Sequence, residues 1–286
     1  MPIDCIVLDF DGTFTDVEAE AAPFVPAYQR DVEEVLGRDV SRAWKEATEE
    51  VSKHPNLYGW KHNDQIVAPA LADPYILCTV VAHLVFERFQ VLQDKEFRSA
   101  ILQLVYSRAY QLTQHHFRPY AAEVIEALLA KLPGKVFVVT NSNPDTVKKK
   151  LDELLPKLSE RLHVEGNAKK FMLDELAPTE DGYQTFAQLP LERKVQSLAE
   201  RSILVRRGHY FRILQKLWRQ TNTSPQNTLV CGDIYELDLS LPEALGASVH
   251  LVTRPGTPPY ERDAALSLGS RGALSEDLRS IIGRLG

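Results

Sequence analysis

The chain has 286 residues, of which 44% are hydrophobic and 25% are charged, a balance typical of globular proteins that dissolve in water. This length is enough to bury a full core in one or two domains. The formal net charge of -6 argues against nonspecific binding to nucleic acid or to an anionic membrane. The chain opens without a secretory signal and its three cysteines show no Cys-x-x-Cys spacing, so we expect a reducing, cytoplasmic location.

The first predicted element is a short buried strand, Ile6–Leu8, which is followed directly by acidic residues. Asp9 comes straight after the apolar run, Asp11 follows two residues later, and Gly12 breaks the pattern. Ligands bind at the carboxyl ends of parallel strands, so these aspartates indicate a site. Side chains two residues apart on an extended chain point the same way, so the two carboxylates would repel unless a cation lay between them. Ordinary turn chemistry is the alternative interpretation.

The run that contains these aspartates is Asp9-Phe10-Asp11-Gly12-Thr13, and it resembles the first motif of the haloacid dehalogenase-like (HAD) hydrolases. The resemblance implies an α/β fold with a Rossmann-like core, a mainly parallel sheet, Mg2+ as cofactor and an aspartyl-phosphate intermediate. It also implies that Asp9 is the nucleophile and that Asp11 exchanges protons with the leaving group and with water. We group Thr13 with the substrate-binding residues and expect it to fix the Asp11 loop.

The next hundred residues predict helices and no strands, because apolar residues recur at three- and four-residue spacing. The predicted helices are Tyr28–Leu36, Val40–Val51, Tyr75–Leu92 and Glu96–Gln114. An aromatic and polar loop is expected at 56–62. In position and character, residues 17–117 resemble the helical cap domain that many family members carry between their first and second motifs. Residues 1–16 and 118–286 are then the predicted Rossmann-like catalytic core.

A second buried strand is predicted at Lys135–Val139, and it leads into Thr140-Asn141-Ser142. A new helix begins at Asn143-Pro144 and is predicted over Asp145–Glu160. A hydroxyl and backbone N–H groups therefore lie at a helix start, where an anion can bind. A simple helix cap is the alternative interpretation. The position matches the family's second motif, which implies that Thr140 holds the phosphoryl group with Asn141 beside it.

The family's third motif is a lysine near the start of the helix before the last motif strand, and here that place holds Arg206-Arg207. Arg207 could substitute in binding phosphate. Alternatively Lys170, or its neighbour Lys169, reaches in from the end of the strand Leu162–Glu165. We favour Lys170, because a compact ammonium better bridges a carboxylate and a phosphoryl oxygen, although adjacent lysines are commonly a solvated surface pair. The polar stretch Leu173–Glu200 is predicted to be loop-like.

The strand Thr228–Cys231 leads into Gly232-Asp233-Ile234-Tyr235-Glu236-Leu237-Asp238, which resembles the fourth motif in its Gly-Asp-x-x-x-x-Asp form. An acidic helix start is the alternative interpretation. Mg2+ prefers oxygen ligands, and Asp9, the backbone carbonyl of Asp11 and Asp233 would supply them. Asp238 would orient Lys170 or complete the metal site. A last strand and a closing helix are predicted at Ala247–Val252 and Ser275–Leu285.

These features predict a Mg2+-dependent phosphohydrolase that acts on a small phosphorylated metabolite. An acid at position 11 favours phosphate ester hydrolysis over dehalogenation, because a halide leaves without being protonated. Phosphomutase and phosphonatase chemistry stay open. A binding protein that keeps the fold without turnover also stays open, because the third motif is irregular.

Overall fold

The computed structural model describes residues 2–285, and this part of the chain divides into two compact units. The first, here called the core unit, consists of the residues up to Thr15 and those from Phe117 onward. The second, the helical unit, is Asp16–His116. The helical cap was predicted at residues 17–117, so each predicted boundary lies one residue further along the chain than the boundary in the structure.

The core unit is built on a parallel sheet, which within residues 2–285 has six strands in the order β10-β9-β8-β1-β4-β5. The strands are β1 Cys5–Leu8, β4 Val136–Val139, β5 His163–Glu165, β8 Thr228–Gly232, β9 Ser248–Val252 and β10 Gly272–Ser275. The segments of β1, β4 and β8 are buried at every residue, as expected of strands covered on both faces. The predicted α/β fold class is confirmed.

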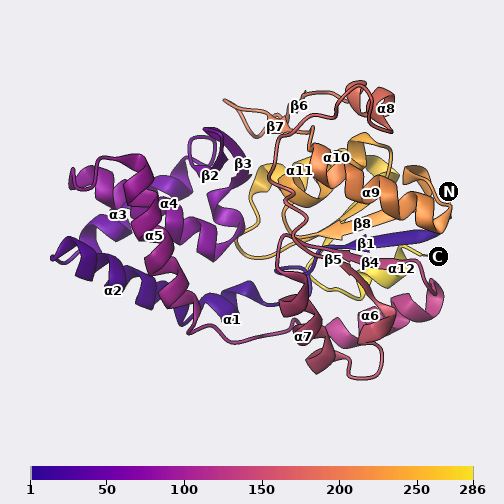
Figure 1. Ribbon diagram of the computed structural model, residues 1–286, viewed down its shortest axis with the longest axis horizontal. Helices are drawn as coiled ribbons and strands as arrows, with labels where there is room; N and C mark the ends of the chain where they lie inside the picture. The colour runs from indigo at the N-terminus through magenta and orange to yellow at the C-terminus, as the bar shows by residue number, and fades with distance from the viewer. Residues whose placement is uncertain (1, 286) are drawn as a thin grey trace. The chain divides into compact units, whose positions relative to one another are not determined.

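Helices cover both faces of this sheet (Figure 1). They are α6 Ala121–Lys131, α7 Pro144–Leu154, α9 Gly208–Thr221, α10 Ser240–Ala244, α11 Pro259–Leu266 and α12 Ser280–Gly283. Alternate residues of β1 pack on opposite faces of the sheet. Val7 packs with α9 and α11, whereas Ile6 and Leu8 pack with α6, α7 and α12. Two hydrophobic cores therefore hold β1 at the centre of the core unit.

The structure corrects two predicted helices. The helix after Asn143 ends at Leu154 and does not reach Glu160, because Pro156 excludes helical geometry at the residue before it. The closing helix predicted at Ser275–Leu285 is only Ser280–Gly283, and Gly272–Ser275 instead pairs with β9 as an additional strand. Such short edge strands depend on a partner strand that local periodicity does not reveal.

Residues 166–207 connect β5 to α9. Residues 171–207, here called the insert, contain more structure than the predicted loop. They form the short helix α8 Tyr183–Ala187 and the antiparallel pair β6 Glu192–Arg193 and β7 Ile203–Leu204. Arg193 bonds Glu243 at 2.6 Å and Arg201 bonds Glu236 at 2.9 Å, so partly buried ion pairs fasten the insert to the rest of the core unit.

The helical unit contains α1 Val17–Ala21, α2 Phe24–Leu36, α3 Ser41–Lys53, α4 Pro74–Arg88 and α5 Lys95–Tyr110. Its core is a cluster of rings and aliphatic side chains around Phe24, Tyr28 and Trp44. Within residues 2–285, no helix is both long enough and apolar enough to cross a bilayer.

The prediction that the helical unit lacks strands is wrong. A hairpin, β2 Gly59–His62 and β3 Gln65–Pro69, occupies part of the predicted loop at 56–62. Its two turn residues, Asn63 and Asp64, both have positive φ, at 49° and 61°. Two-residue hairpin turns need this left-handed conformation, which Asn and Asp tolerate.

Candidate active site

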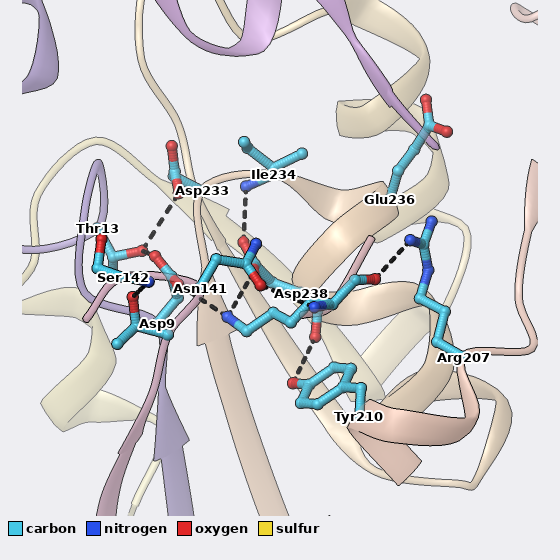
Figure 2. Close-up of polar contacts among 12 residues, drawn as sticks. Asp9, Thr13, Asn141, Ser142, Arg207, Tyr210, Asp233, Ile234, Glu236 and Asp238 are labelled. Carbon is cyan, nitrogen blue, oxygen red and sulfur yellow. Dashed lines mark hydrogen bonds and ion pairs between the residues drawn. The ribbon is translucent and has the colours of Figure 1, made fainter. Parts of the chain in front are cut away.

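The site lies at the carboxyl ends of three neighbouring strands. Because β1 lies between β8 and β4, the residues that follow these strands meet at one edge of the sheet. Asp9 follows β1, Asp233 follows β8 and Thr140 follows β4. Figure 2 shows Asp9, Asp233 and Asp238 directed toward a common region.

Asp9 is held by donors on both carboxylate oxygens and is 8% exposed. Its Oδ1 accepts a hydrogen bond from Lys170 Nζ at 2.8 Å, and its Oδ2 accepts one from Thr13 Oγ1 at 3.1 Å. Thr13 is fully buried, and its hydroxyl also lies 3.5 Å from Asp233 Oδ1. The Thr13 hydroxyl therefore orients two carboxylates, and the expectation that Thr13 binds substrate stays a prediction.

Lys170 is the cation that reaches the carboxylates. Its Nζ lies 2.8 Å from Asp9 and 2.7 Å from Asp238, and it sits 5.6 Å from the centre of the Tyr210 ring. Its neighbour Lys169 is exposed. Of the alternatives for the third motif, the structure therefore places the Lys170 ammonium beside the predicted nucleophile.

Arg207 lies elsewhere. Its side chain is fully buried, and its NH1 donates to the backbone carbonyl of Lys170 at 2.6 Å. Figure 2 shows it on the far side of Asp238 from Asp9. The guanidinium bonds the main chain of Lys170, and the expectation that Arg207 binds substrate stays a prediction.

Asp233 and Asp238 have different surroundings. Asp238 uses both oxygens within the protein, since Oδ1 contacts Lys170 and Oδ2 accepts from Ile234 N at 3.1 Å. Asp233 Oδ2 accepts from Arg254 Nε at 2.9 Å. Of the two predicted roles of Asp238, the contacts favour orientation of Lys170 over metal ligation.

Gly12 brings the first loop against Asp233. Its φ is +82°, and a Cβ at this position would lie 2.2 Å from Asp233 Oδ2. Both the backbone conformation and the close approach therefore require glycine here.

Asp11 is held apart from the other carboxylates. Its Oδ1 lies 2.9 Å from Lys150 Nζ, and its Oδ2 accepts from Ser142 Oγ at 2.6 Å. Asp9 and Asp11 thus have different partners. Because β1 ends at Leu8 and Asp11 lies on a turn, the two-residue periodicity of a strand does not apply between them.

The residues of the predicted second motif mainly hold the site together. Thr140 is buried and its Oγ1 accepts from the backbone N–H of Ser142 at 3.1 Å. Asn141 Oδ1 accepts from the backbone N–H of Lys170 at 2.7 Å. The side chain that caps α7 is Asn143, so the simple-cap interpretation does not account for Thr140 and Asn141.

Three functional candidates were missed by the sequence analysis: Ser142, Lys150 and Arg254. The signal for Arg254 was its place two residues after the end of a predicted strand, at the same edge of the sheet as Asp233. Lys150 lies in a run of three lysines, and only its position on α7 distinguishes it from Lys148 and Lys149, which are exposed.

The surroundings of Asp9 oppose its ionisation. Burial raises the pKa of Asp9 well above its ordinary value, Lys170 opposes this rise, and the carboxylates of Asp238 and Asp233 reinforce it. Burial lowers the pKa of Lys170, but Asp238 and Asp9 outweigh burial and leave it raised. Lys170 is therefore a cation, and an additional positive charge would stabilise the ionised form of Asp9.

These residues fit a divalent metal ion. Among the described residues, ligand atoms of Asp9, Asp233 and Asp238 lie within 4.8 Å of one another. Asp9 Oδ2 and Asp233 Oδ1 both approach the Thr13 hydroxyl, whereas Asp238 is occupied by Lys170 and Ile234 N. Oxygen donors from one or two carboxylates are the set that Mg2+ takes in proteins.

Comparison with known proteins agrees with this geometry. Residues 3–246 match the family described as haloacid dehalogenase-like hydrolase, and the chain belongs to this family. No curated protein matches the chain significantly.

Solved structures share the fold. YfnB from Bacillus subtilis, assigned as a HAD-hydrolase and bound to magnesium, aligns over 100% of this chain and 99% of its own, with a TM-score of 0.52 and 14% identity. A protein from Haemophilus somnus assigned as a phosphoglycolate phosphatase aligns over 98% of this chain and 97% of its own, at a TM-score of 0.52 and 14% identity. A protein from Thermotoga maritima assigned as a β-phosphoglucomutase aligns over 99% of this chain and 100% of its own, with a TM-score of 0.53 and 11% identity. At these identities the likeness concerns the fold alone.

Proposed function

We propose that the protein is a Mg2+-dependent phosphohydrolase that acts on a small phosphorylated metabolite through an aspartyl-phosphate intermediate. The observation that carries this proposal is the environment of Asp9: a carboxylate at a strand end, oriented by Thr13, paired with Lys170 and close to Asp233. A nucleophile fixed in this way needs no rearrangement before it attacks phosphorus.

In the first step, the Asp9 carboxylate attacks phosphorus. An O–P bond forms to Asp9 while the bond from phosphorus to the leaving alcohol oxygen breaks, and Asp11 gives that oxygen a proton. In the second step, Asp11 takes a proton from water, the resulting hydroxide attacks phosphorus, and the bond to Asp9 breaks. Inorganic phosphate leaves, and both carboxyl groups return to their starting states.

The remaining residues neutralise and orient the phosphate. Lys170 places a cation beside Asp9, and the Thr140 hydroxyl and Asn141 bind phosphoryl oxygens. Asp9 and Asp233, with the backbone carbonyl of Asp11, would hold Mg2+, which supplies positive charge that offsets repulsion between carboxylate and phosphate. Asp238 keeps Lys170 in place.

Two features favour this proposal over its alternatives. Asp11 provides an acid that a departing halide does not need, which favours phosphate esters. The irregular third motif was the argument for a non-catalytic protein. This argument is weaker because a lysine is present beside the proposed nucleophile, with Lys170 Nζ 2.8 Å from Asp9 Oδ1.

The test is phosphate release from a panel of small phosphate esters with and without Mg2+. Asp9→Asn should abolish Mg2+-dependent release while circular dichroism shows an intact fold. Asp4→Asn is the matched control, because Asp4 lies just before β1, at the other end of the strand from Asp9. Full activity in Asp9→Asn, or no release from any ester with the wild type, would contradict the proposal.

A further inference from the structure

Lys170 stands on a loop of unusual conformation. Two residues just before it, Asn167 and Lys169, have positive φ values of 51° and 44°. Residues other than glycine seldom adopt this region, so surrounding contacts must hold the loop in it. The resemblance places the family's lysine at a helix start, whereas here the insert separates Lys170 from α9.

The main chain of Lys170 is held on both sides. Its N–H donates to Asn141 Oδ1 at 2.7 Å, and its carbonyl accepts from Arg207 NH1 at 2.6 Å. Arg207 is fully buried, and Figure 2 shows it together with Tyr210 beyond Asp238. A charged donor to a buried carbonyl makes a stronger bond than a neutral one.

Arg207 is itself well anchored. It directly precedes α9, and the backbone N–H of Gly208 donates to Asp174 O at 2.9 Å. The backbone N–H of His209 donates to Asp174 Oδ1 at 2.9 Å. The two ends of the insert are therefore tied together beside Lys170, and α9 fixes the position of the guanidinium.

We propose that Arg207 is a positioning residue, which together with Asn141 clamps the main chain of Lys170 so that its ammonium stays between Asp9 and Asp238. This inference rests on the proposed function, because it assigns Arg207 an effect on catalysis through Lys170. The arginine at the start of α9 thus supports a lysine that lies on the preceding loop.

The first test compares Arg207→Met with Arg206→Met. Arg206 is the matched control, because it bonds the backbone carbonyls of Ala187 and Leu189 inside the insert and does not contact Lys170. Misplacement of a catalytic group by about 1 Å can lower the reaction rate roughly 100-fold. We therefore expect Arg207→Met to lower kcat by about 10- to 100-fold and to leave KM within about twofold of the wild-type value. Arg206→Met should keep kcat within about threefold.

The decisive test is a double-mutant cycle with Lys170→Met, measured by kcat. If Arg207 acts through Lys170, Arg207→Met in the Lys170→Met background should add less than about a twofold loss, because the two effects are then not additive. Should Arg207→Met fail to fold by circular dichroism, Arg207→Gln, which keeps a polar side chain at this buried position, takes its place in the same cycle. Additive losses, or wild-type kcat in Arg207→Met, would overturn the inference. Wild-type activity in Lys170→Met would instead count against the proposed function.

Discussion

Lys150 Nζ lies 2.9 Å from Asp11 Oδ1, although the two residues are 139 positions apart in the chain. The Lys150 side chain is 4% exposed, and Ser142 holds the other carboxylate oxygen of Asp11 at 2.6 Å. The residue that we propose exchanges protons with substrate and water is therefore oriented at both of its oxygens. Lys150 and Ser142 together fix the orientation of its carboxyl group.

Lys150→Met should reduce turnover in a manner that depends on the leaving group. General acid catalysis contributes roughly 100- to 10,000-fold, and it matters most for alcohols that leave poorly without a proton. We therefore expect a loss of about tenfold or more in kcat/KM, which reports the step in which the alcohol leaves, for an alkyl phosphate and a much smaller loss for p-nitrophenyl phosphate. Lys149→Met, an exposed neighbour on the same helix, is the control. Equal losses for both esters would mean that Lys150 does not act through Asp11.

Arg254→Met should lower the free energy of unfolding, and Mg2+ should restore part of that free energy. Arg254 and Asp233 are both buried, with Arg254 NH2 2.8 Å from Asp233 Oδ2. Removing one partner of a buried ion pair costs about 3–5 kcal/mol, because the other charge stays buried alone. A metal ion bound to Asp233 would neutralise that charge.

The measurement for Arg254 is the free energy of unfolding from urea denaturation, with EDTA and with saturating Mg2+. Mg2+ should stabilise Arg254→Met more than it stabilises the wild type. Arg279→Met, which removes an exposed ion pair with Asp277, should change stability by less than about 1 kcal/mol under either condition. An Mg2+ effect of the same size in wild type and Arg254→Met would argue against a metal ion at Asp233.

The parts of the site that could be predicted are those that follow buried strands. Apolar runs such as Ile6–Leu8 indicate parallel strands, and acidic residues directly after them lie at the ligand-binding edge. This reasoning found Asp9 and Asp233, and charge chemistry favoured Lys170 over Arg207. The resemblance to HAD hydrolases was confirmed by the family match.

The parts that could not be predicted depend on helix register and on partners distant in the chain. Among the three lysines 148–150, only packing of α7 decides which one is buried beside Asp11. Strand β10 forms because it pairs with β9. The hairpin in the helical unit has Asn63-Asp64 as its turn, and this dipeptide is a weaker hairpin signal than Asn-Gly. Local sequence carries little information about such pairings.

His250 should make stability depend on pH. Burial, together with the charge of Arg284, lowers its pKa from 6.5 to about 4. Its Nε2 lies 2.8 Å from Ser275 Oγ, which itself donates to the Asp277 carbonyl, so the neutral imidazole donates through Nε2. Within residues 2–285, its Nδ1 has no hydrogen-bond partner that could stabilise the cation.

The unfolded chain therefore binds a proton at His250 more readily than the folded protein does. The contribution of neutral His250 is complete above pH 6.5 and is lost progressively as the pH falls toward 4, by about 2–3 kcal/mol. Denaturant unfolding between pH 4.5 and 7.5 should show a steeper fall in the wild type than in His250→Gln. Parallel pH profiles for the two proteins would contradict this assignment.

Gly12→Ala should weaken metal binding without unfolding the protein. A methyl group at this position would lie 2.2 Å from Asp233 Oδ2, and the φ of +82° disfavours any side chain. Relief of this clash requires Asp233 or the loop to move, which separates Asp233 from Asp9. We expect Mg2+ affinity, measured by isothermal titration calorimetry, to fall by at least about tenfold, since geometry governs Mg2+ coordination strictly. Gly37→Ala is the control, because its φ of +63° is equally left-handed but nothing lies within 4 Å of the added methyl. It shares the backbone strain and lacks the clash, so equal Mg2+ affinity in the two variants would show that the loop at Gly12 does not set the position of Asp233.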